Sequence, residues 1–141
     1  MDPNVWGPGA WTFLHSLTLT YPKKPNYLDK QRYSQFFHNL QFVLPCPTCQ
    51  KHYQLNVKKN PIQLDSRDDL VAWLVNIHND VNRKNGKRMW SLDEFYSHYQ
   101  ELYSDEPKQS DYKKYIVVLI VIVAMILLFL YFKKSKKDPP F

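Results

Sequence analysis

The chain has 141 residues, enough for one small domain, and its 19 basic and 13 acidic side chains give a net charge of +6. Residues 1–111 hold 13 basic and 12 acidic side chains, whereas residues 112–141 hold six lysines and one aspartate, so the excess lies at the C-terminal end. A nucleic-acid-binding domain usually spreads its cations over a folded face. Disordered chains are poor in aromatic residues, which make up 16% here, and two cysteines are too few for a disulfide scaffold.

The first two predicted elements are helices. Pro8 fits the first turn of a helix that runs to about Thr20. Asn26 can cap a second helix over residues 29–44, where apolar residues recur at a spacing of three to four. Pro45 ends this helix because proline disrupts a helix interior.

Three further helices follow in the first hundred residues. The third covers residues 46–59, and the fourth is capped by Ser66 and ends at Gly86. The segment Ser91-Leu92-Asp93-Glu94 is a capping box that opens a fifth helix, which runs to about Tyr103. No segment alternates as a β-strand does. The sequence therefore predicts an all-α fold, a four-helix bundle with a short fifth helix.

The C-terminal region has the pattern of a membrane span. Residues 116–132 contain no charged or strongly polar side chain, and as a helix they would extend roughly 26 Å. A buried core helix is the alternative, but it would carry a polar face. The lysines that flank the span can reach the lipid headgroups; they are Lys113, Lys114, Lys133, Lys134, Lys136 and Lys137.

We therefore expect four parts along the chain. They are a helical domain over residues 1–104, a polar linker over 105–111, a transmembrane helix with its flanks over 112–134, and a short basic tail over 135–141. No signal peptide opens the chain, which favours a tail-anchored protein with its N-terminal domain in the cytosol. The four lysines after the span, against two before it, favour the opposite orientation.

Both cysteines lie in one motif, Cys46-Pro47-Thr48-Cys49. Three interpretations compete: a zinc site completed by His52 and a distant histidine such as His78, a pair of inert thiols, and a redox-active disulfide. A helix N-terminus stabilises a thiolate, and an exposed turn gives a partner access to it. This favours the redox pair. With no further cysteine in the chain, the electrons must go to a cofactor or another protein.

Three segments carry a resemblance to a known family. Residues 6–17 (WGPGAWTFLHSL), 46–49 (CPTC) and 78–87 (HNDVNRKNGK) resemble the Erv/ALR family of FAD-linked sulfhydryl oxidases, and the likeness covers roughly residues 4–103. The resemblance implies that the bundle binds FAD, that protein dithiols are oxidised, and that electrons pass to O2 to give H2O2. One cysteine pair with a membrane segment is similar to the minimal members of large DNA viruses. That likeness implies disulfide formation in virion proteins, in the host cytoplasm or at a virion membrane.

The resemblance also implies roles for individual residues. Cys46 would receive the substrate thiolate, and Cys49 would lie beside the flavin. The implied cofactor-binding residues are Gly7, Trp11, His15, His78, Asn79, Asn82, Lys87, Trp90 and Tyr99. Core packing is the alternative for Trp11, His15 and Tyr99. No metal site is expected with this assignment.

The chain departs from many relatives in its cysteines. It has no shuttle pair, so Cys46 would meet a dithiol protein substrate or a thioredoxin-like relay protein directly. The family's structural disulfide is also missing, and apolar packing of Val75 and Leu92 is expected in its place. A homodimer without a covalent link fits the family. Two other functions stay open from the residues alone, a tail-anchored zinc-binding adaptor and a redox-inert interaction protein.

Overall fold

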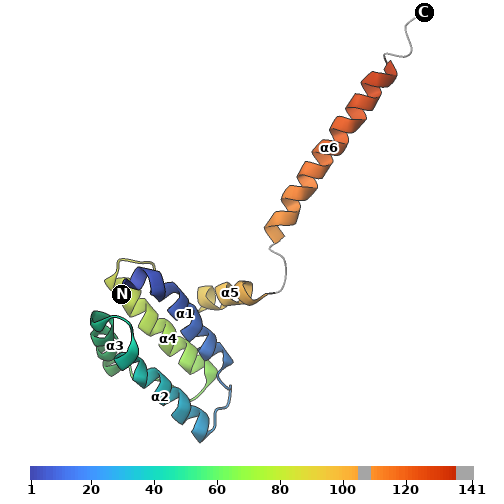
Figure 1. Ribbon diagram of the computed structural model, residues 1–141. Helices are drawn as coiled ribbons and strands as arrows, with labels where there is room; N and C mark the ends of the chain where they lie inside the picture. Colours follow the sequence, from blue (N-terminus) through green and yellow to red (C-terminus); the bar gives the residue numbers. More distant parts are fainter. Residues whose placement is uncertain (105–108, 136–141) are drawn as a thin grey trace, which may run out of the picture. The chain divides into compact units, whose positions relative to one another are not determined.

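A computed structural model describes residues 1–104 and 109–135 (Figure 1). The helices are α1 (Pro3–Thr20), α2 (Tyr27–Val43), α3 (Pro47–Lys59), α4 (Arg67–Lys84), α5 (Leu92–Tyr103) and α6 (Gln109–Ser135). The described ranges contain no strand, so the predicted all-α fold is confirmed. The chain divides into two compact units, residues 1–98 and 99–141, which are described separately.

The predicted helix caps form as hydrogen bonds. The side chains of Asn26 and Asp29 form a reciprocal capping box at α2, and Ser66 Oγ accepts from the amide of Asp69 at α4. The amide of Glu94 donates to Ser91 Oγ at the start of α5. Local sequence therefore sets where these helices begin, since each side chain satisfies an amide that lacks a helical partner.

The start of α1 differs from the prediction. The helix begins at Pro3 with Asp2 as its cap, whose Oδ1 accepts from the amide of Asn4 at 2.9 Å. Pro8 lies inside the helix and not in its first turn, so that expectation was wrong. The physical reason is that Asp2 and Pro3 already supply a cap and a proline at the first helical position.

The core of the first unit is built around aromatic rings. Its buried side chains are Leu14, Tyr21, Phe37, Tyr53, Leu70, Trp73, Leu74 and Ile77. Polar atoms in this core have backbone partners: Tyr53 Oη donates to Phe37 O at 2.8 Å, and Trp73 Nε1 donates to Asn60 O at 2.8 Å. Burial raises the pKa of the Tyr53 hydroxyl, so that donor stays protonated.

Contacts between helices fix their directions. The guanidinium of Arg67, at the start of α4, donates to the carbonyl of Tyr21, just after α1, so these two helices are antiparallel. On α2, the ring of Tyr33 lies 4.6 Å from Tyr21, and Phe37 lies 5.1 Å from Trp73 on α4. α2 therefore runs in the direction of α4. Its C-terminal end, which leads into the cysteine motif, lies where α1 begins and α4 ends (Figure 1).

The long helix α6 contains the predicted membrane span. Residues 115–133 have a mean hydropathy of 3.2 and are long and apolar enough to cross a membrane, and none of this stretch is buried. The predicted linker and tail fall partly outside the described residues, namely 105–108 and 136–141. Residues 109–111 of that linker are helical, since α6 starts at Gln109.

Candidate functional site

A stack of rings joins α1 to α4. The ring of Trp11 lies parallel to that of His78, with centroids 3.9 Å apart and an interplanar angle of 8°. One turn further along α1, His15 Nε2 lies 3.0 Å from His78 Nδ1, at hydrogen-bond distance. The ring of Phe95, at the start of α5, lies 4.8 Å from His15 on another side. The two motifs that contain these residues, 63 positions apart, thus meet in one cluster.

Burial keeps both histidines of this cluster neutral at physiological pH. It lowers the pKa of His15 to about 3, and the nearby His78 lowers it further. Burial also lowers the pKa of His78 to about 4, with a further contribution from the positive charge of Lys87. Two neutral rings can share one hydrogen bond, one nitrogen donating and the other accepting. The pair is therefore a fixed, uncharged surface and not an acid.

The loop after α4 brings Lys87 and Trp90 to this end of the bundle. Asn82 is buried, and its carbonyl accepts from the amide of Lys87 at 2.8 Å. Gly86 turns the chain at φ 64°, a conformation that favours glycine. The loop is thereby folded back onto the last turn of α4. This explains how the positive charge of Lys87 comes to act on His78.

Asn79 holds the far end of the same loop. Its Nδ2 donates to Trp90 O, and its Oδ1 accepts from Trp90 N, each at 2.8 Å. Both polar atoms of the side chain are used by the backbone of one residue. In this arrangement Asn79 positions Trp90, whose ring lies 5.0 Å from that of His98. A hollow of about 140 Å³ adjoins Trp90, and it is lined also by Arg88, Met89 and Glu94.

The two cysteines form a disulfide at the start of α3. Cys46 is the helix cap, and its Sγ accepts from the amide of Cys49 at 3.2 Å. The side chain of Gln50 donates to Phe42 O and Leu44 O, at 3.2 and 2.8 Å, and so fixes the turn before the disulfide. Both cysteines are half-buried. Sulfurs joined in a disulfide are not thiolate ligands, which argues against the zinc interpretation.

Sequence and structure comparisons agree on the relatives of this chain. The model of the Erv1 / Alr family matches residues 8–104, which include the cysteine motif and the whole ring cluster. The chain belongs to the Erv1/Alr family. The prediction made from the three motifs is confirmed.

Two viral relatives in this family are similar over most of the first unit. A probable FAD-linked sulfhydryl oxidase of Acanthamoeba polyphaga mimivirus is 42% identical over 97 residues, which cover 67% of this chain and 68% of the relative. An FAD-linked sulfhydryl oxidase of African swine fever virus is 31% identical over 96 residues, covering 68% of this chain and 81% of that protein.

A cellular relative and a solved structure extend the comparison. The FAD-linked sulfhydryl oxidase ERV1 of Arabidopsis thaliana is 37% identical over 81 residues, which are 57% of this chain but only 42% of that protein. The crystal structure of the FAD-binding domain of Erv1 from Saccharomyces cerevisiae superposes with a TM-score of 0.69 at 29% identity. It covers 74% of this chain and 99% of that one.

The residues themselves fit a bound FAD, which has flat ring systems and two phosphates. Gly7 is buried, yet a Cβ built there would meet no atom within 4 Å, so space is left beside it. The buried Trp6 Nε1 has no hydrogen-bond partner among the described residues, and it offers a donor to a ligand. The parallel Trp11 and His78 rings offer a flat apolar face, and Lys87 offers a cation for a phosphate.

One predicted site residue, Tyr99, falls outside the first compact unit. Tyr99 begins the second compact unit, where it is buried with its ring 6.1 Å from that of Tyr103. Trp6 and Phe95 were missed by the sequence analysis. Trp6 lies within the first motif, but Phe95 has only its place in an apolar pattern.

The packing expected in place of the family's structural disulfide forms on one side only. Val75 is 3% exposed, as expected, whereas Leu92 stays 42% exposed. Leu92 is the first residue of α5, where its side chain meets solvent.

Proposed function

We propose that this chain is an FAD-dependent thiol oxidase that forms disulfide bonds in protein substrates through Cys46 and Cys49. One pairing of features carries the proposal: the first unit holds both a disulfide that caps α3 and a stack of Trp11, His15 and His78 that joins α1 to α4. A thiol-reactive pair and a surface that could bind flat rings are thus present in the same compact unit. Membership in a family whose relatives are named FAD-linked sulfhydryl oxidases supports it.

The exchange step uses only the cysteines of this chain and the substrate. A substrate thiolate attacks Cys46 Sγ, the Cys46–Cys49 bond breaks, and Cys49 is left as a thiolate. A second substrate thiolate then attacks the substrate sulfur and releases Cys46 as a thiolate. The amide of Cys49, which donates to Cys46 Sγ, and the N-terminus of α3 stabilise that leaving group. Two electrons pass from the substrate to the pair.

FAD, when bound, supplies the two-electron acceptor that restores the Cys46–Cys49 disulfide and delivers the electrons to O2. One dithiol and one O2 then give one disulfide and one H2O2, which balances atoms and electrons. On this proposal Trp11, His15 and His78 form the face that packs on its rings, and Lys87 faces its phosphates. Gly7, Asn82, Trp90 and Tyr99 complete the proposed binding residues, and Asn79 acts by holding Trp90.

We also propose that α6 anchors the protein in a membrane, with the cysteine pair in the cytosol. The apolar residues 115–133 support an anchor, and the viral relatives support a role in disulfide formation for virion proteins. On this proposal residues 1–104 are the oxidase domain and 112–134 the span with its flanks. The partners are a dithiol protein or a thioredoxin-like relay protein, O2 and the membrane.

The test uses the full chain purified in a nonionic detergent. We expect the protein to be yellow from flavin absorbance and to consume O2 when dithiothreitol is added. Cys49→Ser should keep the flavin absorbance and lose the O2 uptake, because the disulfide can no longer form. Thr48→Ser, an exposed change in the same turn, is the control and should keep both. A colourless protein, or turnover in Cys49→Ser, would contradict the proposal.

A further inference from the structure

Positive charge is concentrated in one part of the first unit. Residues 30–64, which include most of α2, the disulfide turn and all of α3, contain five Lys and Arg and no Asp or Glu. The rest of residues 1–98 holds seven basic and eight acidic side chains, a net charge of −1. The first unit has a net charge of +4, so residues 30–64, which hold the reactive disulfide, carry all of its positive excess.

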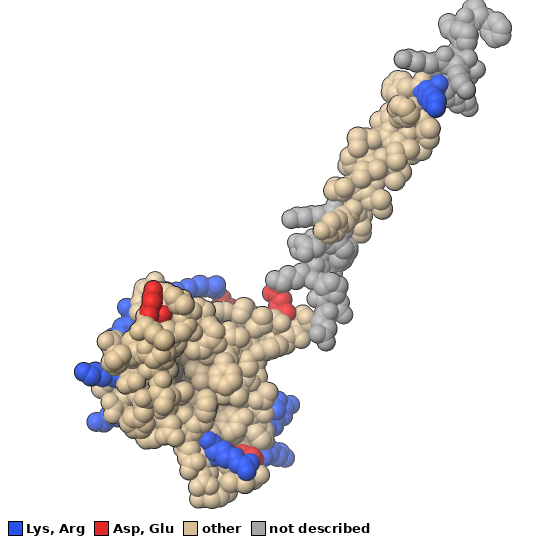
Figure 2. Space-filling view, viewed as in Figure 1, with Lys and Arg blue, Asp and Glu red and all other residues tan. Residues whose placement is uncertain are grey.

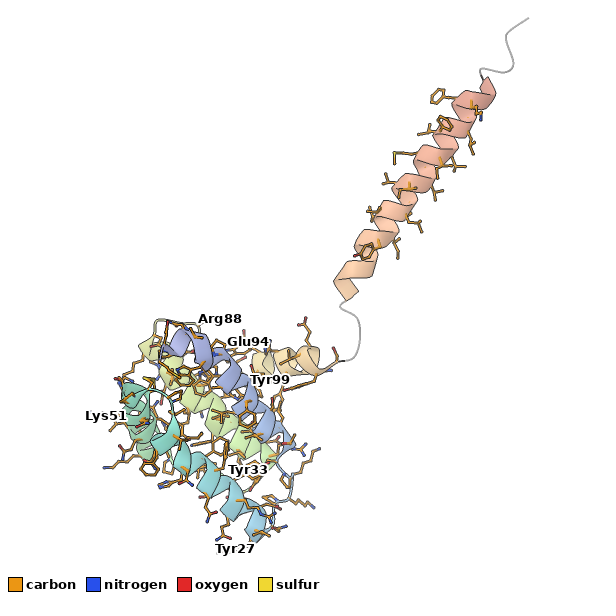
Figure 3. All side chains as sticks on the ribbon, viewed as in Figure 1. Tyr27, Tyr33, Lys51, Arg88, Glu94 and Tyr99 are labelled. Carbon is orange, nitrogen blue, oxygen red and sulfur yellow. A yellow bond between two sulfur atoms is a disulfide. The ribbon has the colours of Figure 1, made fainter. Side chains whose placement is uncertain are left out.

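Three of these five cations lie on α3. Lys51, Lys58 and Lys59 are exposed, and Lys51 follows Cys49 by two residues (Figure 3). On the side of the first unit that α3 forms, Figure 2 shows mainly blue side chains, with a red one above them. Lys30 is the exception because it pairs with Asp65 at 2.6 Å. The acid that contacts the end of α3 is Asp80, and it is paired with Arg83.

Two exposed apolar side chains lie a few residues before the disulfide in the chain. Phe42 is 63% exposed and Val43 is 68% exposed, and both lie in the last turn of α2. The Gln50 side chain donates to the backbone carbonyls of Phe42 and Leu44, so the backbone that carries these two apolar side chains is held in place before a partner binds. A preorganised apolar surface beside a reactive group lowers the entropic cost of binding a partner there.

The cysteine content decides where a substrate must come. Both cysteines of these 141 residues lie in the disulfide, so within this sequence a substrate exchanges directly with that pair. The docking surface and the reactive sulfur must therefore be neighbours. We infer that Phe42, Val43 and Lys51, around the Cys46–Cys49 turn, form a docking surface for an acidic polypeptide with apolar residues beside its cysteines. This inference rests on the proposed function and names its substrate class.

The test compares two dithiol peptides on the full chain in nonionic micelles. The peptides share the same two cysteines and flanking leucines, and one carries glutamates where the other carries lysines. We expect kcat/KM to be about tenfold higher for the glutamate peptide at low ionic strength, with the difference shrinking as salt is added. Turnover of dithiothreitol, which is small and uncharged, should not depend on salt.

Two matched pairs of variants locate the effect. Lys51→Glu should reduce the preference for the glutamate peptide several-fold, whereas Lys24→Glu makes the same charge change in the exposed loop before α2 and should not. Phe42→Ser should raise KM for both peptides. Its control is Phe13→Ser on α1, a ring that is 57% exposed and, like Phe42, makes an edge contact with another ring.

The outcomes separate this inference from the proposed function. Binding is measured alone, by fluorescence anisotropy, with peptides in which serine replaces both cysteines. Preferential binding of the glutamate peptide supports the surface even if dithiothreitol is not oxidised, a result that would remove the proposed function only. Equal binding of the two peptides overturns the inference. So does loss of binding to both when phosphatidylserine is added to the micelles, since the cations then serve lipid headgroups.

Discussion

At the scale of single residues, burial changes the chemistry of His15 most. The side chain is 2% exposed, its Nε2 lies 3.0 Å from His78 Nδ1, and its pKa falls to about 3. Histidine side chains often carry protons in enzymes, but the His15 ring cannot do so near neutral pH because its pKa is too low. Its contribution is a rigid uncharged contact with His78, which in turn lies flat against Trp11.

Because His15 and His78 are neutral in the folded protein, its free energy of unfolding should depend on pH. Both rings have folded pKa values below the ordinary value of 6.5, so below that pH the unfolded chain binds more protons than the folded one. The free energy of unfolding should therefore fall as the pH drops from about 6.5 towards 4. His15→Phe should reduce this loss by about 1–2 kcal/mol between roughly pH 7 and pH 5, measured by denaturant unfolding.

The exposed His38 is the control for this measurement. His38→Phe should leave the pH dependence unchanged, because this ring is exposed and lies outside the buried histidine pair. An acid-induced loss of the same size in His15→Phe and the wild type would show that His15 is not buried as a neutral ring.

At the scale of elements, local patterns predict where helices begin and fail where two segments compete. Asn26, Ser66 and Ser91 cap their helices as predicted, because a cap depends only on a side chain and an amide three residues later. The start of α1 was misplaced because two prolines, Pro3 and Pro8, could each occupy a first turn. The capping residue decides which proline starts the helix, and here Asp2 caps α1 just before Pro3.

The candidate site could be predicted in part for the same reason. The motifs indicate that Trp11, His15 and His78 belong together, and the structure brings their rings into contact. The partner of Asn79 could not be predicted, since Trp90 reaches it only after the chain turns at Gly86. A hydrogen bond between a side chain and a distant backbone leaves no periodic pattern in a sequence.

This loop contact gives a prediction for stability. Asn79→Leu removes both hydrogen bonds to the backbone of Trp90 and leaves its polar atoms unpaired, which should cost about 1–3 kcal/mol. Asn76→Leu, the same change at an exposed position of α4, should cost less than about 0.5 kcal/mol. Denaturant unfolding followed by tryptophan fluorescence measures both. Equal losses in the two variants would show that the contact does not stabilise the loop.

At the scale of the whole molecule, composition alone misleads about charge. The sum of +6 combines three regions with different roles: the lysine-rich C-terminal part, residues 30–64 with +5 and a remainder of −4. The sequence already indicated that the net charge says nothing about nucleic-acid binding, since most of the excess positive charge lies beyond residue 111. The concentration of positive charge in residues 30–64 gains a structural meaning only when α2, the disulfide turn and α3 are known to carry it.

The apolar helix gives a prediction at this scale. The full chain should stay with phospholipid vesicles after a wash at high salt and alkaline pH, because residues 115–133 can span the bilayer. Val123→Arg combined with Ile126→Arg should release it into the supernatant, since each arginine at the centre of a span costs roughly 2.5–3.5 kcal/mol. Lys133→Arg keeps the charge at the helix end and should not. Release of the wild-type chain would contradict the anchor.

Cys46 is the cap of α3, and on the proposed function it is also the sulfur that the substrate attacks. In the mixed disulfide Cys46 Sγ would be bonded to the substrate protein. The amide of Cys49 would then donate to a sulfur whose position also depends on the bound substrate. The first turn of α3 would then loosen and tighten once in every catalytic cycle. Hydrogen exchange at that one amide would follow the redox state of the enzyme, and substrate release would be coupled to the regrowth of a helix end.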